Sequence, residues 1–151
     1  MNEILTQELT IRASARIVYE LLTDADSFAE WMAVEAELQA WPGGLARWTH
    51  ANGDVCRGQI VELVPHRRVV FTYGWERAEV GIPPGSTTVE IDLIEADGVT
   101  TLRLTHRGLS PPAAKVHAVG WQHYLGRLVV RAEGGDPGPD PWTDEPVPSF
   151  L

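Results

Sequence analysis

The feature that most constrains the fold is a change of hydrophobic period along the chain. From residue 34 to about residue 107, apolar and polar residues alternate in short runs separated by turn signals, which is typical of half-buried β-strands. From Ser110 to about Arg131, the apolar residues recur with the period of a helix. One long helix that follows a series of strands can bury its apolar stripe by packing on the sheet that those strands form.

Segments rich in glycine, proline and asparagine divide the strand region. The Asn52-Gly53 pair, which lies between two strand-like runs, is the strongest hairpin signal in the sequence. An earlier strand is predicted at 3–11, and two short helices follow it with Ser14 and Asp24 as their N-caps. Six further strands are predicted at 34–40, 45–51, 54–64, 67–76, 86–95 and 99–107.

The long helix begins at Ser110-Pro111-Pro112, because proline is well tolerated in the first turn of a helix. Residues 1–132 are therefore predicted to form one domain. The remainder, 133–151, is an acidic, proline-rich tail without periodicity, which is either extended or wraps around the body.

Composition limits the classes of function. A chain of 151 residues with 44% hydrophobic residues can build one domain with a substantial core. Its net charge of −9 makes nucleic acid and anionic membranes poor partners. No apolar run is long enough to span a membrane and the first residues lack a secretory signal, so a cytoplasmic protein is expected. With a single cysteine, Cys56, no intramolecular disulfide is possible, and no metal site or cofactor is predicted.

Residue parity predicts which side chains line the space between sheet and helix. Alternate residues of a strand share one face, and three helix residues, His117, Trp121 and Tyr124, lie on one side. An apolar space lined by aromatic rings and few polar groups is typical of a small-molecule site. The candidate ligand-binding residues are Trp31, Trp48, Phe71, Tyr73, Trp75, His106, His117, Trp121 and Tyr124.

Each candidate also has a purely structural interpretation. The tryptophans can fill the core instead of lining a pocket. His106 can be a polar anchor or a general base inside an apolar cavity, or it can be bonded to a backbone carbonyl or an adjoining loop. We expect no chemical role for several other residues. Trp41 should pack in a turn, and Cys56 should be a small strand residue. Four side chains should be solvated: His123, Asp136, Asp140 and Asp144.

The segment at 15–24, with Trp31 a few residues later, resembles the opening motif of the START-like (SRPBCC) superfamily. It is most similar to the branch named after the activator of Hsp90 ATPase. The central strands and the helix motif match the same branch at Gly43-Gly44, at Gly58 with the run 60–65, at 101–106, and at Gly120-Trp121 with Leu125 and Leu128. The resemblance covers roughly residues 3–132.

This resemblance implies an α+β helix-grip fold. A curved antiparallel sheet would wrap around the C-terminal helix, with two short helices after the first strand and a cavity open to apolar ligands. The superfamily contains ligand carriers, polyketide cyclases, toxin-sequestering proteins and co-chaperone domains, so the fold alone does not choose a function.

We predict binding of a small hydrophobic or amphipathic ligand in that cavity, without a catalytic residue. One alternative is a co-chaperone-like interaction domain that resembles the Hsp90 ATPase activator. Another is an enzyme similar to a polyketide cyclase or hydrolase, for which His106 and His117 would supply the acid or base. The prediction leaves a homodimer open.

Overall fold

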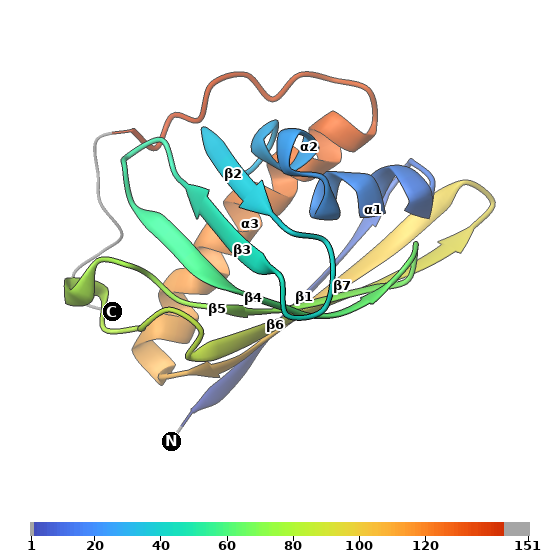
Figure 1. The fold of residues 1–151 in the computed structure, drawn as a ribbon. Coiled ribbons are helices and arrows are strands. Elements are labelled where there is room, and N and C mark those ends of the chain that lie inside the picture. The colour runs from blue at the N-terminus through green and yellow to red at the C-terminus, as the bar shows by residue number, and fades with distance from the viewer. Residues whose placement is uncertain (1, 144–151) are drawn as a thin grey trace.

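A computed structural model describes residues 2–143 of the chain (Figure 1). The strands and α-helices follow one another in the predicted order, and one short 3-10 helix, which was not predicted, lies between the fifth and sixth strands. Their bounds are β1 (Glu3–Ile11), α1 (Ala15–Thr23), α2 (Ala25–Ala29), β2 (Glu35–Leu38), β3 (Leu45–Thr49), β4 (Val55–Val64), β5 (Arg68–Tyr73), the 3-10 helix η1 (Ala78–Val80), β6 (Thr87–Ala96), β7 (Val99–Leu109) and α3 (Pro111–Ala132).

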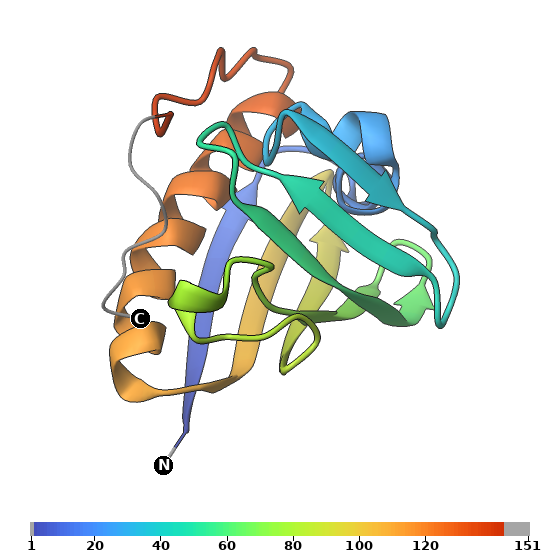
Figure 2. The same ribbon diagram turned by 60° about the vertical axis from the view of Figure 1, so that its left-hand side comes forward.

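The strands form one antiparallel sheet in the order β1-β7-β6-β5-β4-β3-β2. Strands β2 to β7 therefore pair with their neighbours in sequence, and β1 joins the far edge by pairing with β7. The sheet curves around α3, which runs beside β1 (Figure 2). This architecture confirms the helix-grip fold.

Two glycines show why the strands bend and turn where they do. A Cβ at Gly58 would lie 1.8 Å from the carbonyl oxygen of Thr72, so only glycine allows β4 to approach β5 this closely. Gly53 has a φ of 92°, a conformation that favours glycine, in the turn between β3 and β4. The hairpin predicted at Asn52-Gly53 is therefore confirmed.

The predicted helix caps are also confirmed. The side chains of Ser14, Asp24 and Ser110 each accept a hydrogen bond from the backbone N–H three residues further on. These bonds satisfy N–H groups that have no partner within their helices, so the N-terminal ends of α1, α2 and α3 are set by local sequence.

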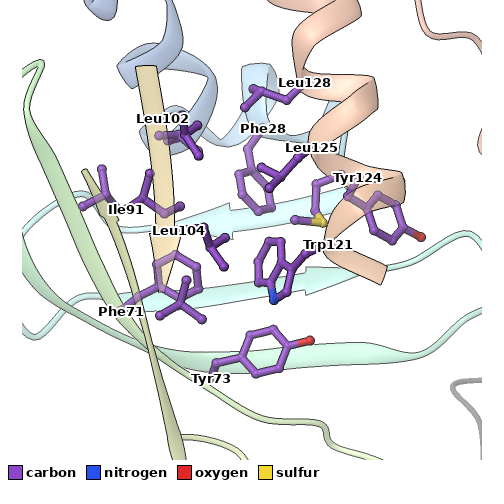
Figure 3. Packing of buried hydrophobic residues seen from close by; sticks show 14 of the residues in the cluster. Phe28, Phe71, Tyr73, Ile91, Leu102, Leu104, Trp121, Tyr124, Leu125 and Leu128 are labelled. Carbon is purple, nitrogen blue, oxygen red and sulfur yellow. The ribbon is translucent and has the colours of Figure 1, made fainter. Parts of the chain in front are cut away.

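The core lies between the concave face of the sheet and α3. Figure 3 shows Trp121, Leu125 and Leu128 of α3 facing Leu102 and Leu104 of β7. All five side chains are at most 4% exposed. Helix and sheet therefore bury one another's apolar face, as the change of period in the sequence predicts.

Trp41 is an exception to this pattern. It lies in the turn between β2 and β3, where its side chain is 57% exposed, so the prediction that it packs is wrong. The turn is closed by main-chain hydrogen bonds, from Trp41 N–H to the Gln39 carbonyl and from Gly44 N–H to the Trp41 carbonyl, and does not require the indole.

Within residues 2–143, no helix has the length and apolar character needed to cross a membrane.

Candidate functional site

The structure places all nine predicted site residues inside the molecule, each at most 8% exposed. Tyr73 of β5 lies at the centre of the ring contacts. Its ring centroid is 4.6 Å from that of His106, 5.7 Å from that of His117 and 6.0 Å from that of Trp121. Strands and helix thus contribute to one cluster of aromatic rings, as parity predicts.

The remaining rings extend this cluster towards α2. Trp48 of β3 contacts Phe71 and Tyr73 at centroid separations of 5.8 and 6.0 Å. Phe28 of α2 bridges Trp48 and Trp31 at 5.0 and 5.1 Å. Most of these contacts are edge-to-face or tilted, the arrangements that aromatic pairs prefer.

Three tryptophans in this cluster share a polar arrangement, in which each indole N–H donates to a buried histidine nitrogen at 3.1–3.2 Å. An indole N–H can only donate, so the nitrogen that accepts it carries no proton. We call these contacts the indole–imidazole pairs, and they are Trp48–His50, Trp75–His117 and Trp121–His106.

The second nitrogen of each histidine is also engaged. His106 donates from Nε2 to Thr87 Oγ1 at 2.9 Å, since the Thr87 hydroxyl itself donates to the Tyr73 carbonyl. His117 donates from Nδ1 to the Ala113 carbonyl at 2.8 Å. The hydrogen-bond partners therefore assign a neutral tautomer to both rings.

His50, which is also buried, completes the same pattern. Its Nε2 accepts from Trp48, and its Nδ1 donates to the Tyr124 hydroxyl at 3.1 Å. That hydroxyl donates in turn to Asp140 at 2.6 Å. A continuous hydrogen-bonded chain thus connects the aromatic interior with residue 140, beyond the end of α3.

Burial keeps these histidines neutral. Loss of solvation lowers the pKa of His106 to about 3, with a smaller contribution from His117. It lowers the pKa of His50 to about 4, against the opposing charges of Asp140 and Asp54. The pKa of His117 is lowered by burial despite its bond to the Ala113 carbonyl. With both nitrogens engaged, neither His106 nor His117 has a free lone pair for acid–base catalysis.

Our sequence analysis missed His50. Strand parity could have found it, because it lies two residues after Trp48 and so on the same face. The Cys56 sulfur lies 4.0 Å from His50 Nε2, but that nitrogen already accepts from Trp48. Cys56 is fully buried and burial raises the pKa of its thiol, so this contact does not activate a nucleophile.

The described part of the tail lies against α3. We call residues 134–143 the strap; it turns back from the end of the helix and runs alongside it (Figure 2). The Asp140 side chain is 9% exposed and accepts hydrogen bonds from Tyr124 and His123. The Trp142 ring stacks on His123 with centroids 3.8 Å apart.

The predictions that Asp140 and His123 are solvated are therefore wrong. The Tyr124 hydroxyl faces away from the other labelled side chains of the cluster in Figure 3, and it provides a donor that a carboxylate can reach. Asp136 is exposed, and Asp144 lies outside the described residues.

Arg127 holds the strap at a second point. Its guanidinium donates to the carbonyls of Pro137 and Gly138 in the strap, at 3.2 and 2.8 Å, and to the carbonyl of Trp31 at 3.0 Å.

Between residues 2 and 143, every buried side-chain nitrogen or oxygen has a hydrogen-bond partner. The same residues contain no group of three or more acidic, histidine or cysteine side chains that could hold a metal ion.

Solved structures with the same fold include an AHSA1-like protein from Rhizobium etli. It is 42% identical, with a TM-score of 0.73 over 97% of this chain and 91% of that protein. The Aha1 dimer from Colwellia psychrerythraea is 20% identical, with a TM-score of 0.73 over 88% of this chain and 98% of that one.

DynU16, a protein of the dynemicin biosynthetic locus, is 22% identical with a TM-score of 0.78. The match covers 91% of this chain but only 49% of DynU16, so the chain spans about half of that protein's length. No curated protein matches the sequence.

The helix-grip architecture and these relatives place the chain in the START-like superfamily. Residues 12–133 match the family described as "Activator of Hsp90 ATPase homolog 1-like protein". Because that match covers most of the chain and the Rhizobium etli protein is 42% identical over nearly all of it, the chain belongs to the AHSA1-like family.

Proposed function

We propose that the protein binds a small hydrophobic or amphipathic ligand in its interior, between the sheet and α3. The observation that carries this proposal is the aromatic cluster around Tyr73, which β3, β5, β7 and α3 build together. An apolar ligand gains free energy by leaving water for such surroundings.

The hydrogen bonds of the interior limit the chemistry of the ligand. In two of the indole–imidazole pairs, the indole N–H of Trp75 bonds to His117 and that of Trp121 bonds to His106. These polar atoms are therefore already engaged within the protein. A ligand group that enters among these rings must be apolar, or must replace one of these hydrogen bonds. Buried donors without a partner are costly, so we expect a hydrocarbon or aromatic portion to occupy this region.

The six tryptophans of the chain provide the test, because each gives one indole N–H signal in a two-dimensional ¹H–¹⁵N spectrum. The protein would be titrated with 2-naphthamide and with 1-anilinonaphthalene-8-sulfonate. Binding in the interior should shift the signals of Trp75 and Trp121 and leave that of Trp41, which is 57% exposed, in place. If the interior signals stay in place at saturating probe, the proposal fails.

A matched pair of variants sharpens this test. Trp121→Phe changes the wall of the proposed site, and Trp41→Phe makes the same substitution at an exposed position. We expect Trp121→Phe to change the dissociation constant at least fivefold and Trp41→Phe to leave it unchanged. Equal constants for both variants would indicate that the probes bind elsewhere.

An interaction domain is the second candidate. It is favoured by the complete pairing of buried polar groups within residues 2–143, which is what a solid core requires. The Aha1 protein from Colwellia psychrerythraea has the same fold and is a dimer, so this fold can support contacts between protein chains. If no probe enters the interior, stimulation of a bacterial Hsp90 ATPase by this chain would support the second candidate.

A further inference from the structure

Three side chains of α3 direct hydrogen-bond donors at the strap. They are the ring of His123, the hydroxyl of Tyr124 and the guanidinium of Arg127. All three lie within five consecutive residues, and Tyr124 also belongs to the buried cluster through its ring contact with His50 at 4.9 Å. This group of donors therefore lies at the edge of the interior.

A carboxylate already accepts hydrogen bonds from two of these donors, His123 and Tyr124. One oxygen of Asp140 accepts from the Tyr124 hydroxyl at 2.6 Å, and the other accepts from His123 at 3.0 Å and from the Trp142 backbone N–H at 3.0 Å. Burial raises the pKa of Asp140, but these hydrogen bonds outweigh it and the pKa lies below the usual value. Both oxygens of an ionised carboxylate are thus bound.

Arg127 adds a positive charge that no carboxylate neutralises within residues 2–143. Its three hydrogen bonds go to main-chain carbonyls, two of them in the strap. If the strap moves away, Tyr124, His123 and Arg127 all lose acceptors. The donors that the strap vacates can then bind another acceptor, and a carboxylate is preferred over water because hydrogen bonds to a charged acceptor are stronger.

We propose that Tyr124 and His123 form a carboxylate-binding site, which Asp140 occupies within the same chain. The ligand of the interior is then an amphipathic carboxylate. Its apolar part enters among the aromatic rings, and its head group takes the place of Asp140 on α3. This inference rests on the proposed function, and it names the class of ligand and the segment that competes with it.

In this proposal, the carboxylate of the ligand takes the place of the Asp140 carboxylate. The head group therefore binds at the strap-facing side of α3 and not among the buried indole–imidazole pairs. A head group bound at Tyr124 needs no hydrogen bond from the interior, so the apolar part of the ligand can remain among rings. The strap competes as a tethered segment with a high effective concentration, and removing its carboxylate should therefore strengthen ligand binding.

Two probes that differ only in the head group test the inference, 2-naphthoate and the neutral 2-naphthamide. In Asp140→Ala, we expect the dissociation constant of 2-naphthoate to fall at least tenfold and that of 2-naphthamide less than threefold. Asp136→Ala is the matched control, because this exposed strap carboxylate accepts only from the Gly138 N–H among the described contacts, and it should change neither constant.

The double variant Asp140→Ala/Tyr124→Phe should lose most of the gain for 2-naphthoate, because the hydroxyl donor is absent. Equal gains for both probes in Asp140→Ala would mean that the strap is only a steric cover. No gain for 2-naphthoate would mean that Asp140 does not compete. Either result overturns the inference.

A titration of Asp140→Ala with acetate separates this inference from the proposed function. Acetate has no apolar part, so it should shift the side-chain signals of His123 and leave the Trp75 and Trp121 indole signals in place. If acetate binds but no naphthalene probe enters the interior, the carboxylate site stands and the proposed function fails. If 2-naphthamide enters but acetate does not bind, the proposed function stands and the carboxylate site fails.

Discussion

The inner face of α3 and its strap-facing side use similar residues in different ways. On the inner face, His117 and Trp121 bond to partners that are themselves buried, Trp75 and His106. On the strap-facing side, His123 bonds to Asp140, which belongs to a segment without regular secondary structure.

This difference indicates which contacts of α3 a ligand or a substitution can replace without loss of the fold. The inner contacts join the helix to the sheet, so breaking them should lower the free energy of unfolding. The outer contacts join the helix to the strap, so breaking them should release a segment and leave the fold intact. The predictions below test this contrast, beginning with the largest expected effect.

Lowering the pH should have the largest effect on the free energy of unfolding, because it acts on the buried histidines. The folded-state pKa of His50 is about 4 and that of His106 about 3, below the ordinary value of 6.5, and that of His117 is lowered as well. Below about pH 6.5 the unfolded chain binds more protons at these residues, so stability is lost as pH falls towards the folded-state values. Between pH 6.5 and their folded-state pKa values, His50 and His106 should each lower the free energy of unfolding by at most about 1.4 kcal/mol per pH unit, and His117 should act in the same direction.

Urea unfolding at pH 7, 6 and 5 measures this slope. A matched variant, His106→Gln, keeps one donor and one acceptor without a group that titrates in this range, so its slope should be smaller by the contribution of one histidine. A free energy of unfolding that is constant over this range would show that the indole–imidazole pairs do not keep their histidines neutral.

Trp121→Ala should lower the free energy of unfolding by about 3–5 kcal/mol, because it removes a large side chain that is only 4% exposed. The measurement is chemical denaturation at pH 7. Trp41→Ala is the control, since its side chain is 57% exposed and the loss there should stay below about 0.5 kcal/mol. Similar losses in the two variants would contradict the contrast between interior and surface.

Trp75→Phe should cost about 1–3 kcal/mol in the free energy of unfolding, because it leaves His117 Nε2 buried without its donor. The double variant Trp75→Phe/His117→Leu removes both polar partners. It should recover part of the loss, and a double-mutant cycle measures the coupling between the two residues. If the two losses simply add, this indole–imidazole pair contributes no coupling.

Trp142→Ala should have the smallest effect, a loss of about 0.5–1 kcal/mol, because it removes only the stack on His123 and the edge contact with Tyr124. The indole signals of Trp75 and Trp121 should not move, since the strap lies outside the inner face. A loss as large as that of Trp121→Ala would show that the strap is part of the core.

The sequence by itself determined the order of the elements and the face of each strand that points inward. The alternation of apolar residues, the Asn52-Gly53 turn and the Ser110 cap are local features, so they act without the rest of the fold. Parity likewise placed Tyr73 and Trp121 in one interior.

Only the tertiary structure decided which polar atoms meet. Trp75 and His117 are 42 residues apart, and His50 and Tyr124 are 74 apart, so their hydrogen bonds depend on how the curved sheet holds α3. Asp140 lies in a segment without periodicity, where no local pattern shows that its carboxylate is bound. Parity identifies a face but not a partner, because the partner depends on sheet curvature and helix position, which many distant residues set together.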